Sequence, residues 1–302
     1  MNQWILVILV IMPFTMASIH PVNHDLVQNI KESTQQWIPM EPEDNPFYFV
    51  PTEQIKAMMG TKLRVMDIPD EDPTADIPTN FDARDQWSSK IHTIRNQGQC
   101  GSCWAFGATE ALSDRYAIAG EDVILSPQHL VSCDYGNLGC NGGWLDSAWE
   151  FMQITGVVTD ACFPYTSGST GQDGQCFTSC QDGSTWTTYH SGSYTFGASV
   201  TDTQTAIMTN GPVEAAFTVY EDFMNYKSGV YHHTSGSVLG GHAIKAIGWG
   251  TTDEGVDYWI MANSWGTTWG DNGFFKIERG DCGIDGQMTF GSAADAMDGY
   301  SA

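Results

Sequence analysis

The chain has 302 residues, of which 41% are hydrophobic and 12% aromatic, so it carries enough apolar material for a substantial core. It holds 36 Asp and Glu against 12 Lys and Arg, for a formal net charge of −24. A surface this acidic is repelled by phosphate backbones and anionic membranes, which excludes nucleic-acid binding as a function class. We also expect no stable membrane insertion, because no stretch of transmembrane length follows the first residues.

An apolar run at residues 4–14 opens the chain and leads into small residues up to Ser18. The run is too short to cross a bilayer as a helix, and the pattern is typical of a secretory signal peptide. The alternative is a buried strand of the mature fold. We expect residues 1–18 to be a signal peptide that directs the protein into the secretory pathway. The eight cysteines agree with an oxidising compartment.

Residues 19–76 combine many prolines with many acidic side chains, a composition that forms little core by itself. One stretch in this segment, Thr52–Leu63, is typical of a helix. The apolar face of that helix would hold Ile55, Met58 and Met59.

The remaining chain changes character at about residue 190. Residues 77–190 mix helix patterns with loops rich in glycine and cysteine, whereas residues 191–302 favour strands. The expected helices are 103–119, 126–132 and 143–155, and the expected strands are 213–220, 243–249, 258–263 and 274–278. A helical half followed by a β half indicates an α+β fold with a cleft at the junction.

The candidate reactive centre lies in the string Gln-Gly-Gln-Cys-Gly-Ser-Cys-Trp-Ala-Phe, residues 97–106. The spacing of Cys100 and Cys103 leaves three alternatives for Cys103: a redox thiol, a disulfide partner or a zinc ligand. No βαβ pattern surrounds these cysteines, and no further Cys or His lies nearby at ligand spacing. We therefore expect no metal and no cofactor.

Four motifs together resemble the papain-like cysteine peptidases, which order their reactive residues as Cys, then His, then Asn. The motifs are the string at 97–106, Cys-Asn-Gly-Gly at 140–143, Gly-Gly-His-Ala-Ile at 240–244 and Asn-Ser-Trp-Gly at 263–266. The stretches 77–87, 227–231 and 269–275 are similar to the cathepsin B branch of that family. The resemblance spans most of residues 77–302.

The resemblance implies a set of site residues with distinct roles. The set comprises the nucleophile Cys103, its proton partner His242, the orienting residue Asn263, the oxyanion donor Gln97, and Gly142, Gly143, Trp265 and Gln287 at the substrate site. The residue types suit the chemistry, because a thiol is weakly ionised at neutral pH and a helix N-terminus with an imidazolium favours the thiolate. Trp265 would shield the bond between His242 and Asn263 from water. Taken singly, His242 also fits a structural histidine, and Gly142 and Gly143 fit turn glycines.

The same resemblance implies a papain-like two-domain fold, with a helical left domain, a β-barrel-like right domain and the active-site cleft between them. It further implies that residues 19–76 are an inhibitory propeptide and that residues 77–302 form the catalytic domain. We expect the extended part of the propeptide to lie across the cleft, with Ile55–Leu63 near Cys103. The expected partners are protein and peptide substrates and the chain's own propeptide, in a lysosome, a similar acidic vacuole or the extracellular space. The alternative function is that of a catalytically silent binding protein on this fold.

Disulfides are also implied by the resemblance. The pairs are Cys100–Cys140, Cys133–Cys176 and Cys162–Cys180. They leave Cys103 as the reactive thiol and Cys282 as a second free thiol, which we expect to be buried as a small hydrophobic residue.

The sequence departs from cathepsin B in two places. Cathepsin B closes one end of its cleft with a loop that carries paired histidines, but residues 163–175, between Cys162 and Cys176, contain no histidine. We therefore expect an endopeptidase rather than a carboxydipeptidase. Gln287 replaces the acidic residue at the base of the second subsite, so we expect hydrophobic or aromatic preference there with little gain from arginine. Asp285 would compensate if the local chain shifted.

The expected propeptide is acidic, like the domain that it would inhibit. Residues 1–76 hold 4 Lys and Arg against 11 Asp and Glu, which leaves 8 against 25 for residues 77–302. We therefore expect apolar contacts to hold the two parts together. The candidate residues are Trp37, Phe47, Tyr48 and Phe49.

Overall fold

The computed structural model describes residues 20–64 and 76–294, so the expected signal peptide, residues 1–18, lies outside the described residues. The helices are α1 (His24–Ser33), α2 (Thr52–Ala57), α3 (Ala83–Gln86), α4 (Cys103–Ala119), α5 (Pro127–Cys133), α6 (Leu145–Ile154), α7 (Ser167–Thr170) and α8 (Val200–Asn210). The strands are β1 (Trp37–Pro39), β2 (Phe81–Asp82), β3 (Ser191–Phe196), β4 (Val213–Tyr220), β5 (Tyr226–Tyr231), β6 (Val238–Thr251), β7 (Asp257–Ala262), β8 (Phe274–Glu278) and β9 (Met288–Ala293). None of these helices is long and apolar enough to cross a bilayer.

The strands form one mixed sheet in the order β1-β5-β8-β7-β6-β4-β9-β3, with β2 added beside β6. The long strand β6 pairs antiparallel with β4 on one side and with β7 on the other, and this pairing places His242 opposite Phe217. Within the described residues the two ends of the sheet do not pair, so the β half is an open sheet where a barrel-like one was expected. The described residues therefore form the expected α+β architecture with a helical half and a β half.

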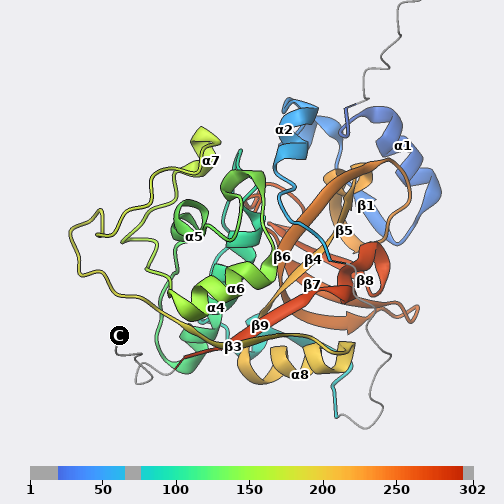
Figure 1. Ribbon diagram of the computed structural model, residues 1–302. Coiled ribbons are helices and arrows are strands. Elements are labelled where there is room, and N and C mark those ends of the chain that lie inside the picture. Colours follow the sequence, from blue (N-terminus) through green and yellow to red (C-terminus); the bar gives the residue numbers. More distant parts are fainter. Residues whose placement is uncertain (1–19, 65–75, 295–302) are drawn as a thin grey trace, which may run out of the picture.

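Helix α4 packs against the sheet and joins the two halves (Figure 1). Its residues from Cys103 to Ala117 are all buried, because it is enclosed by β6, β4 and β9 on one side and by α5 and α6 on the other. The helix ends at Gly120, whose φ of 108° lies in the left-handed region that favours glycine. In Figure 1, α4, α5 and α6 lie on one side of the molecule and α8 lies at the opposite edge from α2.

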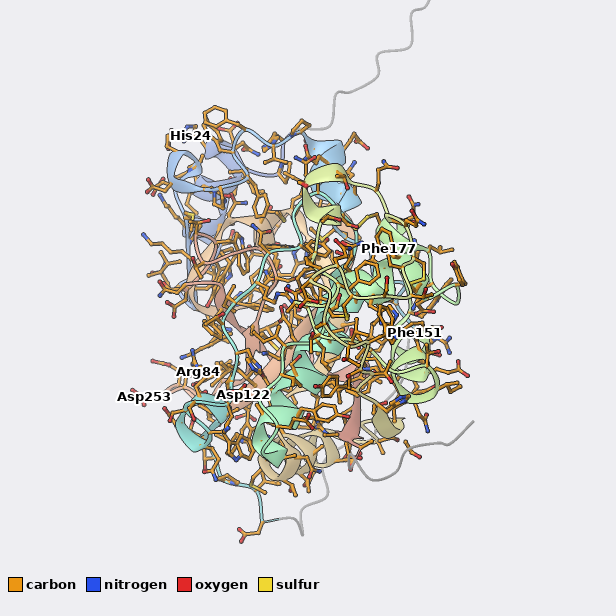
Figure 2. All side chains as sticks on the ribbon, turned by 90° about the vertical axis from the view of Figure 1, so that its left-hand side faces the viewer. His24, Arg84, Asp122, Phe151, Phe177 and Asp253 are labelled. Carbon is orange, nitrogen blue, oxygen red and sulfur yellow. A yellow bond between two sulfur atoms is a disulfide. The ribbon has the colours of Figure 1, made fainter. Side chains whose placement is uncertain are left out.

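The segment from residue 20 to 64, here called the prosegment, caps one end of the molecule in both views (Figures 1 and 2). The rest of the described chain, residues 76–294, is here called the main unit. Strand β1 pairs antiparallel with β5 and so extends the sheet of the main unit. Helix α1 was not predicted, although Asn23 caps it and Leu26 and Ile30 lie on its buried face. The many prolines that follow α1 favour extended chain and mask this helical pattern.

The predicted helix Thr52–Leu63 is shorter in the structure, where α2 ends at Ala57. The chain beyond it is extended, because Gly60 and Thr61 form β-bridges to the main unit. A side chain on Gly60 would meet the carbonyl oxygen of Gly101 at 1.8 Å, so only glycine allows this close approach. Helix α8 is a second difference, since it lies in the half for which only strands were expected.

The cysteines form three disulfides and leave two free thiols. The pairs are Cys100–Cys140, Cys133–Cys176 and Cys162–Cys180. Cys103 is buried, but Cys282 is only partly buried, which differs from the expectation. Cys282 has a φ of 53°, and its thiol donates to Asp281 in a polar loop that leaves it partly open to solvent.

Candidate active site

Cys103 is the first residue of α4, and its side chain is fully buried where the two halves meet. The place between Gly143 and Gly241 that the prosegment backbone occupies is here called the cleft. The thiol sulfur lies 3.1 Å from the hydroxyl oxygen of Thr61 in the prosegment. Burial raises the pKa of the Cys103 thiol, and the hydrogen bonds from Thr61 and from nearby backbone groups offset part of that rise. Burial under the prosegment therefore favours the neutral form of the thiol.

His242 reaches the same cleft from β6. Its Nε2 atom lies 2.8 Å from the side-chain oxygen of Asn263, and its ring stacks on Trp265 at a centroid distance of 4.6 Å. Asn263 and Trp265 follow β7, so the pairing of β6 with β7 brings these three side chains together. Burial lowers the pKa of His242 to about 4, and the Nδ1 atom has no hydrogen-bond partner among the described residues.

Gln97 lies on the loop before α4 and is fully buried. Its Nε2 atom donates to the carbonyl oxygen of Met58 at 3.0 Å and to that of Cys100 at 2.9 Å. The hydroxyl of Ser264 donates to its Oε1 atom at 2.9 Å. This bond orients the amide so that its NH₂ group points to the prosegment. A prosegment carbonyl thus occupies the place where the amide offers its hydrogens.

The glycines Gly142 and Gly143 hold the prosegment backbone. The Gly143 amide donates to the Gly60 carbonyl at 2.9 Å and the Gly143 carbonyl accepts from the Lys62 amide at 2.8 Å. On the opposite wall, Thr61 donates its amide to Gly241 at 3.0 Å. Gly142 has a φ of 109°, and a side chain there would collide with the Gly60 carbonyl.

Gln287 lies at the end of the cleft reached by Arg64, beyond the thiol. Its side chain is 2% exposed, and its Oε1 atom accepts from the Arg64 amide at 3.1 Å, while Nε2 has no partner among the described residues. The carboxylate of Asp285 accepts from the indole of Trp259 at 2.6 Å.

The loop between Cys162 and Cys176 contains the single turn α7 and is held against the helical half. The Gln128 side chain accepts from the amides of Thr166 and Ser167, and it donates to the Asp173 carbonyl. The loop packs beside the start of α4, where Gln99 donates its amide to Gly168.

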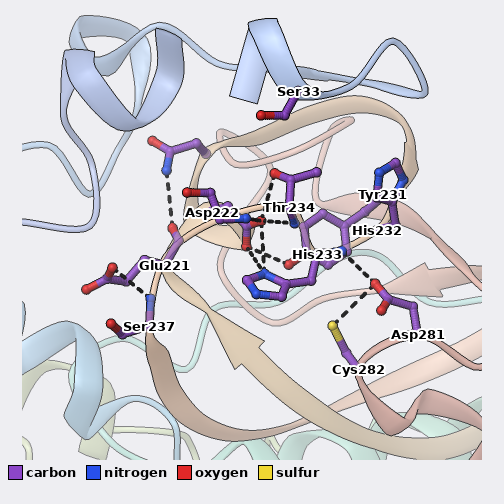
Figure 3. A network of polar contacts seen from close by, with 12 residues as sticks. Ser33, Glu221, Asp222, Tyr231, His232, His233, Thr234, Ser237, Asp281 and Cys282 are labelled. Atoms are coloured by element: carbon purple, nitrogen blue, oxygen red, sulfur yellow. Dashed lines mark hydrogen bonds and ion pairs between the residues drawn. The ribbon is translucent and has the colours of Figure 1, made fainter. Parts of the chain in front are cut away.

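His232 and His233 are in a separate polar network (Figure 3). The ring of His233 lies 3.1 Å from the buried carboxylate of Asp222, which also accepts from the hydroxyl of Tyr231 at 2.7 Å. The Nδ1 atom of His232 lies 3.8 Å from a carboxylate oxygen of Glu278. The network orders the turn after β5, next to the prosegment.

Several individual contacts of this site were not predicted from the sequence. The stretch Ile55–Leu63 was expected near Cys103, but not the contact of Thr61 with the thiol or that of Met58 with Gln97. Tyr165 makes further contacts of this kind, since its hydroxyl donates to the Gln97 carbonyl and contacts the Ser102 hydroxyl, both at 2.7 Å. No motif marks it, because it comes from a loop that only folding brings to the start of α4.

Comparisons with known proteins agree with this arrangement. A family model described as papain family cysteine protease matches residues 77–292. Cathepsin B-like CP2 of Giardia intestinalis is 47% identical over 227 residues, covering 72% of this chain and 74% of that protein. The gut-specific cysteine proteinase of Caenorhabditis elegans is 47% identical over 249 residues, covering 72% of this chain and 74% of that protein. The solved structure of proCathepsin B S9 from Trypanosoma congolense matches with a TM-score of 0.82 and 27% identity, covering 92% of this chain and all of that one. The chain therefore belongs to the papain family of cysteine proteases and is of the cathepsin B type.

Proposed function

We propose that this chain is the precursor of a thiol endopeptidase in which Cys103 attacks the peptide carbonyl. One observation carries the proposal: the prosegment lies in the cleft as a peptide would, with a carbonyl on Gln97 and a side chain on the thiol. A buried cleft that holds a peptide backbone through glycine amides and carbonyls is suited to binding extended substrates.

The proposed reaction begins when the prosegment leaves and water enters the cleft. The Cys103 proton then passes to the free Nδ1 atom of His242, and the thiolate is stabilised by the N-terminus of α4 and by the imidazolium. Asn263 keeps the Nε2–H of the ring engaged, so that Nδ1 is the atom that accepts the proton.

The thiolate sulfur next bonds to the substrate carbonyl carbon, and the carbonyl oxygen takes the negative charge. Gln97 Nε2 would donate one hydrogen bond to the negatively charged substrate oxygen, and the Cys103 amide would donate the second. The hydrogen bond that Gln97 Nε2 now donates to the Met58 carbonyl oxygen supports this role. His242 returns its proton to the leaving amine, which yields an acyl-enzyme. Water then hydrolyses the thioester, with His242 accepting and returning the proton.

Endopeptidase activity is the finer part of the proposal. The loop from Cys162 to Cys176 carries no histidine that would hold a substrate carboxylate, and Gln128 ties it to the helical half. We expect efficient cleavage within long peptides and poor removal of a C-terminal dipeptide. A matched pair of peptides, one with a free and one with an amidated C-terminus, measures this difference; faster cleavage of the free form would contradict it.

The domain layout is proposed on the same basis. We infer a signal peptide at residues 1–18, an inhibitory prosegment at 19–76 and a catalytic domain at 77–302. The family match begins at residue 77, and the T. congolense proenzyme covers more of the chain than that match does, which supports the division. Three disulfides support passage through the secretory pathway to an acidic or extracellular compartment.

The decisive test is Cys103→Ala in the processed enzyme, with Cys282→Ala as the control thiol. We expect Cys103→Ala to lose all measurable hydrolysis of a fluorogenic peptide while keeping its melting temperature, and Cys282→Ala to keep its activity. A thiol-directed epoxide should label the wild type and Cys282→Ala, but not Cys103→Ala. Turnover by Cys103→Ala would overturn the role of Cys103 as the nucleophile. A wild type that binds peptides without cleaving them would favour the silent binding protein.

A further inference from the structure

Arg64, in the prosegment, makes two polar contacts with the main unit at one end of the cleft. Its guanidinium lies 2.7 Å from the carboxylate of Asp146, and its amide donates to Gln287 at 3.1 Å. The Asp146 side chain is 17% exposed and that of Arg64 is 51% exposed, so solvent reaches the pair from the side of the arginine. The prosegment thus holds a basic side chain against Asp146 of α6, which together with Glu150 of the same helix is here called the acidic wall.

The acidic wall is part of the main unit and remains when the prosegment leaves. Asp146 lies in the first turn of α6, and its second oxygen is buried without a hydrogen-bond partner among the described residues. Glu150 lies one turn further along α6. Burial raises the pKa of Tyr194, the two carboxylates raise it further and Arg64 lowers it, so all three charges lie within electrostatic reach of Tyr194.

The buried amide of Gln287 is the second sign of an unfilled polar site. Its Nε2 atom has no partner among the described residues, although the side chain is 2% exposed. Buried polar atoms without partners are uncommon, and at a cleft they mark places where a ligand completes the hydrogen bonding. Gln287 and Asp146 therefore offer an amide and a carboxylate to whatever replaces Arg64.

We propose that Asp146 is a specificity-determining residue of the processed enzyme, which accepts an arginine or lysine side chain of the substrate where Arg64 now lies. The proposal rests on the peptidase function given above and differs from the expectation from Gln287 alone, in which arginine brings little gain. The carboxylate comes from α6 instead of from the turn near Cys282 that holds Gln287. The Arg64 amide contacts Gln287, which is the residue expected at the base of the second subsite, so the basic residue of a substrate would stand second or third before the scissile bond.

The expected gain is moderate because the pair is half exposed. An ion pair that solvent reaches is screened, and charge-assisted hydrogen bonds recover part of that loss. We expect kcat/KM to be about 3- to 10-fold higher for arginine than for a neutral side chain of the same shape. Citrulline is that neutral side chain, since it differs from arginine in charge but hardly in size.

The test uses processed enzyme, titrated with a thiol-directed epoxide, and two pairs of fluorogenic peptides with arginine or citrulline at the second or third position. For wild type, the arginine-to-citrulline ratio should be about 3 to 10 in one pair. For Asp146→Asn the ratio should fall to about 1, while Asp253→Asn, which removes an exposed charge from the turn after β6, should keep the wild-type ratio.

Each contrary result has a distinct meaning. A wild-type ratio of about 1 at both positions, or a ratio that Asp146→Asn leaves unchanged, would overturn the role of Asp146 while leaving the peptidase intact. Absence of cleavage for every peptide would overturn the proposed function itself. Should Asp146→Asn fail to fold, Arg64→Gln in the full chain removes the same pair from the other side; we expect about 3- to 10-fold faster labelling of the covered thiol, and an unchanged rate would overturn the pair.

Discussion

The reactive thiol and imidazole of this chain are shifted toward their neutral forms by one shared cause, their complete burial. Burial raises the pKa of Cys103 and lowers that of His242 to about 4. A thiolate–imidazolium pair needs the opposite shifts. We infer that the prosegment suppresses activity in two ways, by occupying the cleft and by excluding the water that would stabilise the charged pair.

Gln97 has the geometry of an oxyanion donor, and this role gives a prediction. Gln97→Ala should lower kcat about 100-fold with little change in KM, because the donor acts on charge that develops in the transition state. Ser264→Ala is the matched control, since it removes the bond to Oε1 but keeps the Nε2 donor. Steady-state kinetics of both variants measure this, and a Gln97→Ala enzyme with half of the wild-type kcat would contradict the assignment.

Glu110, about two turns along α4 from the thiol, is buried and shifted in pKa. Burial raises its pKa to about 7 from an ordinary value of 4.5, and the charges of Lys245 and Arg95 offset only part of this effect. Asp114 and His92 also face it, the first raising and the second lowering its pKa. The protonated form of Glu110 is therefore favoured by folding.

The sign of the resulting pH dependence follows from the raised pKa. Stability from Glu110 is fully present below pH 4.5 and is lost as the pH rises to about 7, by about 3 kcal/mol at most. Glu110→Gln stays neutral, so its melting temperature relative to wild type should rise over this window. Thermal melts from pH 4.5 to 8 in the Cys103→Ala background measure the difference, with the exposed Glu254→Gln as the control. A flat difference would contradict the raised pKa.

Among the elements, the prosegment is held to the main unit by aromatic packing and backbone pairing. Trp37 on β1 is 2% exposed, packs against Tyr226 and Tyr231, and donates its indole N–H to the His232 carbonyl. Phe47 packs against Trp265 at 5.4 Å. Apolar contact thus joins two acidic parts, and the Arg64–Asp146 ion pair adds an attractive charge contact that was not expected.

The four aromatic candidates of the prosegment do not contribute equally, and Phe49 differs from the expectation. Its side chain is 90% exposed, whereas Trp37 and Phe47 are buried and Tyr48 is partly buried against the core. Trp37→Ala should weaken docking by about 3 to 5 kcal/mol, and Phe49→Ala should have almost no effect. The rate at which an epoxide labels Cys103 in the full chain measures docking.

The rate of Cys103 labelling by the epoxide should change greatly for Trp37→Ala and hardly at all for Phe49→Ala. Trp37→Ala should label at least about 100-fold faster than wild type, because the covered thiol opens more often. Phe49→Ala should label within about 2-fold of wild type. Equal rates for the two variants would show that the β1 contact does not control access to the cleft.

At the scale of the whole molecule, Arg115 joins the helical half to the sheet. Its guanidinium is 2% exposed and donates to the carbonyls of Gly211, Pro212 and Gly291. Burial lowers its pKa to about 9, so it remains charged at physiological pH. These three bonds connect α4 to the segments that enter β4 and run along β9.

Removal of this guanidinium should lower the free energy of unfolding, because it links the helical half to the sheet. Arg115→Met leaves three buried carbonyls without their donor and should destabilise the fold by about 3 kcal/mol or more. Arg84→Met breaks the partly exposed pair with Asp82 and should cost less than about 1 kcal/mol. Urea unfolding of both variants in the Cys103→Ala background compares the two, and similar midpoints would contradict a joining role for Arg115.

Much of the local structure could be predicted from the sequence, because it depends on patterns within a few residues. The helix 103–119 and the strands 213–220 and 274–278 have the predicted bounds, and Ser126 caps α5 as the Ser-Pro pair suggests. Helix α1 carried a readable cap and apolar spacing that the surrounding prolines obscured.

The sequence by itself determined the family and the residue types of the site, since Cys103, His242 and Asn263 stand in motifs of distinctive spacing. Only the tertiary structure decided what surrounds them. The end of α2 at Ala57, the hydroxyl of Thr61 on the thiol and the ion pair of Arg64 with Asp146 all join segments far apart in the chain. Local propensity favoured a longer helix, but the backbone bonds that Gly60 and Lys62 make to Gly143 favour the extended form. Such contacts depend on how the whole chain packs, and no pattern within one segment encodes them.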